Sequence, residues 1–302
     1  MDTIAGGAPQ TDAATGTDPS LPNSTDAAPL VSGPPPEGTR VPLLVHEMVD
    51  EADVIKPIWQ NALGGLTFRV KPGRATPCSP EYFSAGAVRF VKYQPPAAAQ
   101  IAPLSAEVDR LKWAKPFTSV PAVVDYVHSD DGEEVLVTSQ IMGRPATHPY
   151  WRARPAEAAF AIGDGLRDLH DALPVAECPF SWRVADRVAA LPADVAEKLR
   201  QDAPPEDDLV VCHGDARAPN TLISNFGHLA GHVGLGKLGV ADRWADLAIA
   251  SWSVGLNFGE QYVPEFFRGY GVEPDAEAIE YYRRLWDACD VKHELQFVGS
   301  LD

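Results

Sequence analysis

The chain has 302 residues, a formal net charge of −17 and four cysteines, and each of these properties limits what the protein can be. A chain of this length can bury a large hydrophobic core in one domain or in two lobes. Its excess of carboxylates argues against nucleic-acid binding, because phosphate backbones attract Lys and Arg. The same charge suits a polycationic ligand, although excess acid can equally serve solubility alone.

Cysteine spacing and hydropathy bear on the compartment. The cysteines lack C-x-x-C spacing and stand at Cys78, Cys178, Cys212 and Cys289. We therefore expect reduced thiols in a cytoplasmic protein, and neither a zinc site nor a disulfide framework. No apolar run approaches the roughly 20 residues of a membrane-spanning helix. The first residues also lack the basic and apolar regions of a secretory signal, so we expect neither membrane binding nor export.

The first 140 residues divide into a tail and a strand-rich part. Residues 1–39 are rich in small residues and Pro and contain no aromatic side chain, which predicts a disordered tail. Ser105 is the expected N-cap of a helix. Residues 71–86, rich in Pro and Gly, are expected to form a loop. The predicted strands cover 63–70, 87–93, 121–127 and 134–139, and the predicted helix covers 105–114.

The second half of the chain has helical periodicity. Apolar residues recur at helical spacing in four segments, which are 155–173, 186–201, 242–254 and 275–288. A β-rich part followed by an α-rich part predicts an α+β protein with two lobes. We expect an N-terminal lobe over 40–140 and a C-terminal lobe over 141–302.

A short polar segment between two apolar runs carries the clearest chemical signal. Residues 213–220 read H-G-D-A-R-A-P-N. Phosphoryl transfer from ATP needs a carboxylate that orients the attacking hydroxyl and an amide oxygen that holds magnesium, which predicts roles for Asp215 and Asn220. His213 is expected to support the loop through hydrogen bonds. The alternative is a chance match in a turn, since Gly and Asp are turn residues.

A second motif follows the first. Residues 231–248 read G-H-V-G-L-G-K-L-G-V-A-D-R-W-A-D-L-A. Together the two motifs closely resemble those of the aminoglycoside phosphotransferases, small kinases that phosphorylate antibiotic hydroxyls. The resemblance implies a two-lobed, protein-kinase-like α+β fold with ATP and Mg²⁺ as cofactors. Two positions depart from it: Gly234 stands where the family carries its metal-binding Asp, and Lys237 replaces the usual Arg.

The resemblance also implies the nucleotide site of the N-terminal lobe. Lys92 would hold the ATP phosphates, and Glu107, fifteen residues later, would be its ion-pair partner. Gly64 and Gly65 would form the turn that covers the phosphates, although an ordinary hairpin turn explains them nearly as well. The hinge would lie at 138–141, where the backbone of Ser139 and Ile141 would bind adenine.

The resemblance also implies roles for three carboxylates of the C-terminal lobe. Asp242 and Asp246 match family positions at the start of a helix, where a carboxylate caps free N–H groups. Asp287 matches a short acidic segment near the amino sugar and is a candidate partner for a substrate ammonium group. By contrast, Gly234 removes a charge-stabilising group, and we expect it to cost at least about 10²–10³-fold in rate.

These observations favour transfer of the ATP γ-phosphate to a hydroxyl of an aminoglycoside antibiotic, in the cytoplasm and with resistance as the outcome. One alternative keeps the kinase and changes the acceptor to a peptide antibiotic or a metabolite hydroxyl. Another is a catalytically silent kinase homologue that binds nucleotide or a partner. Gly234 favours the silent homologue, whereas the retained Lys92, Glu107, Asp215 and Asn220 favour an enzyme.

Overall fold

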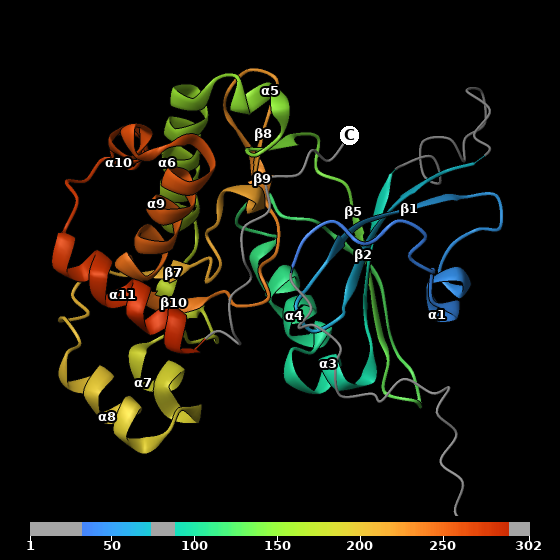
Figure 1. Cartoon of the computed structure of the whole chain (residues 1–302), viewed down its shortest axis with the longest axis horizontal. Helices are drawn as coiled ribbons and strands as arrows, with labels where there is room; N and C mark the ends of the chain where they lie inside the picture. Colours follow the sequence, from blue (N-terminus) through green and yellow to red (C-terminus); the bar gives the residue numbers. More distant parts are fainter. Residues whose placement is uncertain (1–31, 74–87, 290–302) are drawn as a thin grey trace, which may run out of the picture.

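The computed structural model describes residues 32–73 and 88–289. A β-sheet part and a helical part lie side by side, the first drawn in blue to green and the second in green to red (Figure 1). Residues 1–31 and 290–302, Cys78 and most of the predicted 71–86 loop lie outside the described residues. Among those described, Cys178 and Cys212 are free thiols. No helix in the described ranges has the length and apolarity needed to cross a membrane.

The first part is an antiparallel sheet of five strands in the order β1-β2-β3-β5-β4. Apolar side chains of β2, β3 and β5, such as Phe68, Val91 and Val135, are fully buried beneath helix α1. This burial follows from the side-chain alternation of a strand, which directs every second residue to one face. The bounds are α1 Leu43–Glu47, β1 Val54–Gln60, β2 Leu66–Lys71, β3 Arg89–Gln94, β4 Val123–His128 and β5 Glu134–Ser139.

The four strands predicted from the sequence are all present, and β1 is an additional edge strand. Pro57 obscures the strand pattern in β1, but a proline is tolerated at a sheet edge, where no ladder partner needs its missing N–H. The pairing with β2 also shifts register between Pro57 and Trp59. Gly33, assigned by composition to the disordered tail, forms a β-bridge with Gln60. The packed chain therefore begins before residue 40.

Helix α4, Leu104–Ala114, connects the two parts of the molecule. It follows the short helix α3, Pro96–Ile101, and confirms the predicted helix, but Ser105 is not its cap. Pro103 precedes the helix, and the Glu134 carboxylate accepts the N–H of Leu104 instead. The buried apolar face of α4 belongs to the same core as the helices of the second part.

The second part is mainly helical. Three predicted helices are confirmed, but the segment 186–201 is divided, because Pro192 cannot continue a helix and disfavours helical backbone in the residue before it. In Figure 1, α6, α9 and α10 lie together and α11 crosses below them. The helices are α5 Pro149–Arg152, α6 Pro155–Ala172, α7 Val184–Arg187, α8 Ala193–Gln201, α9 Trp244–Phe258, α10 Val263–Tyr270 and α11 Ala276–Cys289.

Short strands position two loops against each other. β7, Leu209–Cys212, pairs with β10, Gly239–Asp242, and Cys212 stands opposite Gly239. β8, Thr221–Ile223, pairs with β9, Leu229–His232, and with β6, Arg144–Pro145; Thr221 stands opposite His232. The chain between β7 and β8 therefore meets the chain between β9 and β10. We call residues 213–220 the HGD loop and residues 233–238 the glycine loop.

Candidate active site

The HGD loop and the glycine loop touch at two glycines. Gly214 and Gly234 both have φ of +77°, a conformation that glycine adopts without strain. A Cβ on Gly214 would lie 2.1 Å from the carbonyl oxygen of Lys237, so no larger residue fits there. A Cβ on Gly234 would lie 3.1 Å from Oδ1 of Asn220. The Asn220 side chain and position 234 are therefore direct neighbours.

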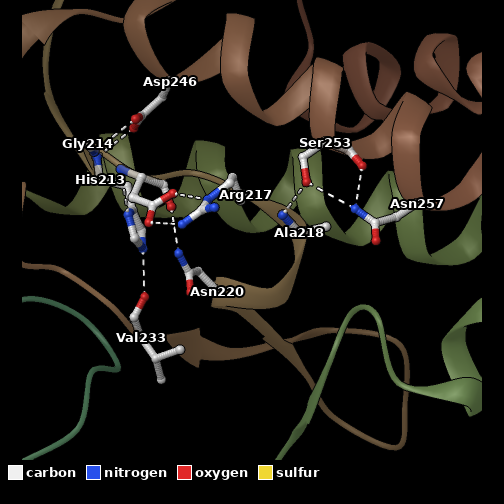
Figure 2. A network of polar contacts seen from close by, with 10 residues as sticks. His213, Gly214, Arg217, Ala218, Asn220, Val233, Asp246, Ser253 and Asn257 are labelled. Atoms are coloured by element: carbon white, nitrogen blue, oxygen red, sulfur yellow. Dashed lines mark hydrogen bonds and ion pairs between the residues drawn. The ribbon is translucent and has the colours of Figure 1, made fainter. Parts of the chain in front are cut away.

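Asp246 holds the start of the HGD loop (Figure 2). Its carboxylate accepts the backbone N–H groups of His213 at 2.5 Å and Gly214 at 3.0 Å, and it contacts Nε2 of His170 at 3.0 Å. The predicted capping role is therefore wrong for Asp246, which turns from helix α9 toward the loop. Asp242 fits its prediction better, because its Oδ1 accepts the N–H of Trp244, the first residue of α9.

Further hydrogen bonds hold the rest of the loop (Figure 2). Nε2 of His213 donates to the carbonyl of Val233 at 3.0 Å, which ties the two loops together. The N–H of Ala218 donates to Oγ of Ser253 at 3.0 Å, and Asn257 donates to the Ser253 carbonyl at 2.8 Å. Both His213 nitrogens are used within the loops, since Nδ1 faces a backbone N–H at 3.2 Å. This arrangement agrees with the predicted supporting role of His213.

The Asp215 carboxylate is gripped by Arg217. Nε of Arg217 lies 2.6 Å from Oδ1, and Nη2 lies 2.9 Å from Oδ2, which is a two-point ion pair. Burial alone would raise the pKa of Asp215, but the charge and hydrogen bonds of Arg217, with the charges of Lys237 and His213, outweigh it. The pKa of Asp215 is thus held well below its ordinary value. The carboxylate stays ionised.

Lys92 and Glu107 form the expected ion pair. Nζ of Lys92, on the central strand β3, lies 2.7 Å from both carboxylate oxygens of Glu107, which is buried on α4. A Cβ on Gly236 would lie 3.7 Å from Cβ of Glu107, so the glycine loop packs against this helix. Arg110 of α4 adds a bond from Nε to the carbonyl of Leu238 at 2.8 Å. The ion pair and the HGD loop therefore meet at the glycine loop.

Comparison with known proteins identifies this arrangement. The profile of the phosphotransferase enzyme family matches residues 81–285, which is more than half of the chain. The chain belongs to the aminoglycoside phosphotransferase family. Its enzyme class is that of the small-molecule kinases, and its two-lobed α+β fold is the kinase-like fold that the motifs predicted.

The relatives of this aminoglycoside phosphotransferase family member are moderately similar in sequence. An aminoglycoside 3′-phosphotransferase of Streptomyces fradiae is 32% identical over 64% of this chain and 85% of its own length. A streptomycin 3″-kinase of Streptomyces griseus is 32% identical over 67% of this chain and 85% of its own. The crystal structure of a type VIII aminoglycoside-3′-phosphotransferase superposes with a TM-score of 0.65 at 26% identity, covering 80% of this chain and 97% of that one.

The magnesium donors expected of the family are incomplete here. Nδ2 of Asn220 donates to the carbonyl of Asp215 at 2.8 Å, and its amide oxygen lies beside position 234. Magnesium in proteins usually binds one or two carboxylates in octahedral oxygen geometry. Gly234 supplies none, and the Asp215 carboxylate is occupied by a guanidinium. One amide oxygen and an arginine-bound carboxylate do not make such a site.

In the glycine turn predicted to cover the phosphates, the backbone N–H groups are bonded within the turn. The side-chain oxygen of Asn61 accepts the N–H groups of Leu63 at 3.0 Å and Gly65 at 2.7 Å. The N–H of Gly64 donates to the Asn61 carbonyl at 3.0 Å, and Gly64 has φ of +86°. The structure thus favours the hairpin alternative, because three amide groups that phosphates could have bound are already used.

At the predicted hinge, the backbone N–H of Ser139 is likewise already bonded within the protein. The N–H of Ser139, at the end of β5, donates to the Ala122 carbonyl at 2.9 Å. The Ser139 hydroxyl accepts the N–H of Ala122, also at 2.9 Å. Its N–H is therefore not available to adenine in this conformation. Ile141 lies two residues past the strand end and packs toward Gly231, where its Cδ1 would be 2.8 Å from an added Cβ. Ile141 remains the predicted contact to the base.

Asp287 lies near the end of α11, beside a large hollow. The preceding residue, Trp286, has Nζ of Lys237 4.6 Å from its ring centroid, so this end of the helix adjoins the glycine loop. Asp287 and Glu280 line a hollow of about 1110 Å³ between α9, α10 and α11. Arg283 shares the hollow, and its guanidinium donates to Ser251 Oγ at 3.2 Å. Both signs of charge therefore line this surface.

Sequence reasoning missed three residues that shape the site. Arg217 was visible as a cation two residues after Asp215, within reach of its carboxylate. Ser253 and Asn257 are spaced four residues apart on α9 and face the HGD loop, but nothing local marks them as loop anchors. Such contacts depend on how α9 packs beneath the loop.

Proposed function

We propose that this protein transfers the γ-phosphate of ATP to a hydroxyl group of an aminoglycoside. The observation that carries the proposal is the convergence on the glycine loop. The Lys92–Glu107 pair approaches this loop at Gly236, and the HGD loop approaches it at Gly234. A phosphate-binding cation and a hydroxyl-orienting carboxylate on two sides of one segment are what phosphoryl transfer requires.

Each side chain has a definable task in this reaction. Glu107 fixes the Lys92 ammonium group so that it can contact the α- and β-phosphates. Asp215 accepts the hydrogen bond of the acceptor hydroxyl and takes its proton as the oxygen–phosphorus bond forms. The bond from the γ-phosphorus to the bridging oxygen breaks, and its electrons remain on ADP. A magnesium ion would have to arrive on the nucleotide, where it would neutralise phosphate charge, because Asn220 without a carboxylate at position 234 does not form a metal site of its own.

The acceptor class follows from charge and from the relatives. A net charge of −17 attracts a polycation, and Asp287 offers a carboxylate next in the chain to Trp286, whose ring contacts Lys237 of the glycine loop. One similar structure, 26% identical with a TM-score of 0.59, is a Streptomyces rimosus aminoglycoside phosphotransferase in complex with ADP and streptomycin. We place the reaction in the cytoplasm, where ATP is available, and antibiotic resistance is its expected consequence.

The experiment is a phosphorylation assay with a panel of aminoglycosides and MgATP, followed by mass spectrometry of the products. We expect the mass of at least one acceptor to increase by one phosphoryl group. Asp215→Asn should abolish the product. Asp171→Asn is the matched control, because Asp171 is exposed on α6 and its carboxylate pairs with Arg167 of the same helix. Phosphorylation by Asp215→Asn at the unmodified rate would contradict the assigned role.

A silent homologue is the second candidate, and Gly234 is the observation that favours it. Such a protein would bind ATP through Lys92 and leave every acceptor in the panel unchanged. Nucleotide binding measured by calorimetry, together with an inactive panel that includes peptide antibiotics, would support this candidate. Turnover of a peptide antibiotic or a metabolite alone would keep the kinase and change its acceptor.

A further inference from the structure

Arg217 lies on the catalytic carboxylate with little freedom to move its backbone. The following residue, Ala218, is tied to Ser253, and the side chains of Arg217 and Asp215 are only 21% and 16% exposed. The guanidinium contacts both oxygens of Asp215, at 2.6 and 2.9 Å. The arrangement is thus a partly buried ion pair whose backbone is held in place while the Arg217 side chain can still rotate.

The ion pair between Arg217 and Asp215 hinders Asp215 from acting on the acceptor hydroxyl during phosphoryl transfer. Asp215 must accept a hydrogen bond from the acceptor hydroxyl, and Arg217 already occupies one lone pair on each of its oxygens. A planar guanidinium binds phosphate oxygens with the same two-point geometry, and a phosphate carries more charge than a carboxylate. A γ-phosphate that arrives next to Asp215 therefore competes directly for Arg217.

The loss of a carboxylate at position 234 makes the surroundings more cationic. Arg217 and Lys237 both act electrostatically on Asp215, which is the one acidic residue within the HGD loop and the glycine loop. An aspartate at 234 would have placed a second negative charge beside Asn220 and favoured a metal ion there. With Gly234, the positive charges of the two loops outnumber the negative ones. Such a site attracts phosphate oxygens directly.

We propose that Arg217 is a further catalytic residue, which moves from Asp215 to the transferring phosphoryl group and supplies the positive charge that a carboxylate-bound metal would otherwise supply. The inference rests on the proposed function. In the reaction, the acceptor oxygen bonds to the γ-phosphorus, its proton passes to the released Asp215 carboxylate, and the bond to the ADP oxygen breaks. Arg217 neutralises the charge on the phosphoryl oxygens throughout and loses no proton.

Nucleotide binding without metal tests the inference independently of any acceptor. In EDTA, Arg217→Gln should weaken ATP binding by about tenfold or more, because it removes charge-assisted hydrogen bonds to the γ-phosphate. ADP lacks that phosphate, so its affinity should not change. Arg217→Lys keeps the charge without the planar two-point geometry, so its ATP affinity should lie between those of the unmodified protein and Arg217→Gln. Equal changes for ATP and ADP, or no change for either, would overturn the proposal.

A double-mutant cycle with Gly234→Asp tests the compensation in the reaction itself. Arg217→Gln should lower kcat by about 10²-fold in the unmodified background and by about tenfold or less beside Asp at position 234. An arginine that only orients Asp215 would cost the same in both backgrounds, which would refute the inference. Arg200→Gln on α8, where Arg200 pairs with Glu197, is the matched control. Thermal unfolding of each variant separates misfolding from lost chemistry.

The two readouts distinguish the possible failures. If no acceptor is phosphorylated, the proposed function fails, but the ATP-against-ADP comparison in EDTA still decides whether Arg217 recognises the γ-phosphate. If transfer occurs and the comparison shows no preference for ATP, the proposed function stands and the role of Arg217 is refuted.

Discussion

The Asp246 carboxylate accepts the backbone N–H groups of both His213 and Gly214, at 2.5 and 3.0 Å. It lies in the first turn of α9 and is 1% exposed, so its charge is stabilised by these bonds and by Nε2 of His170. Tyr270 contacts the other nitrogen of His170 at 2.8 Å. The HGD loop is therefore fixed from below by a buried chain of hydrogen bonds that starts on α10.

The first prediction concerns this support. Asp246→Asn places an NH₂ group among backbone donors and leaves at least one of them unsatisfied. We expect the free energy of unfolding to fall by at least about 2 kcal/mol, because a buried unpaired group costs about 1–3 kcal/mol. Urea unfolding measures the change, and Asp171→Asn on the surface should stay within about 1 kcal/mol. An unchanged midpoint for Asp246→Asn would show that the contacts carry little stability.

The second prediction concerns the proposed base. Asp215→Asn and Asp215→Ala should abolish transfer while ATP affinity stays the same or improves, because each variant releases Arg217 toward the γ-phosphate. Calorimetric titration with a non-hydrolysable ATP analogue gives the affinity, and product mass gives the transfer. A marked loss of ATP affinity would mean that Asp215 organises the nucleotide site rather than the acceptor.

The third prediction concerns the Lys92–Glu107 pair. Lys92→Ala should raise the dissociation constant for ATP by about tenfold or more, which corresponds to about 1.4 kcal/mol. Glu107→Gln should have a smaller effect, because the ammonium group remains but loses its fixed position. Competition with a fluorescent nucleotide measures both constants. Equal affinities in Lys92→Ala and the unmodified protein would remove Lys92 from the nucleotide site.

The fourth prediction concerns magnesium. Gly234→Asp should lower the magnesium concentration needed for half-maximal rate, because it adds a carboxylate next to Asn220. Aspartate tolerates the positive φ of this position better than most residues, although the added Cβ is close to the Asn220 amide. With Arg217 present we expect kcat to rise by about tenfold, and by at least about 10²-fold in Arg217→Gln. Identical magnesium titrations would show that another group already binds the metal.

The fifth prediction is a pH dependence. The pKa of Asp215 is depressed, so the carboxylate stays ionised as the pH falls, and its ion pair stabilises the fold above the unfolded-state pKa of about 3.9. That stability is lost only as the pH falls through the lower, folded-state pKa. Arg217→Gln removes the largest cause that opposes burial, so its kcat/KM, which reports the free enzyme in which the ion pair is intact, should decline toward acidic pH where the unmodified value stays flat. Parallel pH–rate profiles would contradict this assignment.

Motifs whose chemistry depends on neighbours in sequence could be read from the chain alone. The HGD loop, its asparagine and the Gly234 departure were visible because each role requires one residue type at a fixed spacing. Lys92 and Glu107 were found through the family resemblance, and the structure pairs them at 2.7 Å. The strands also followed from alternation, which encodes the buried face locally.

Contacts between segments that are far apart in sequence could not be read in this way. A hairpin turn explains Gly64 and Gly65 nearly as well as a phosphate turn does, and the Asn61 side chain favours the hairpin by accepting two of the N–H groups. The role of Asp246 depends on the position of α9 below the HGD loop. The division of 186–201 is different, because Pro192 was visible in the sequence and its effect on helices is local.

The sequence by itself determined the candidates for the reacting groups and the family of this protein, because the loop that bears Asp215 and Asn220 is contiguous and its residue types match a motif of phosphoryl transfer. Only the tertiary structure decided which charges surround those groups. It packs Gly234 against Asn220, brings Lys237 near Asp215 and places Arg217 on both carboxylate oxygens. The net charge of a site is the sum of charges from several segments that fold together, so it cannot be read from any one segment.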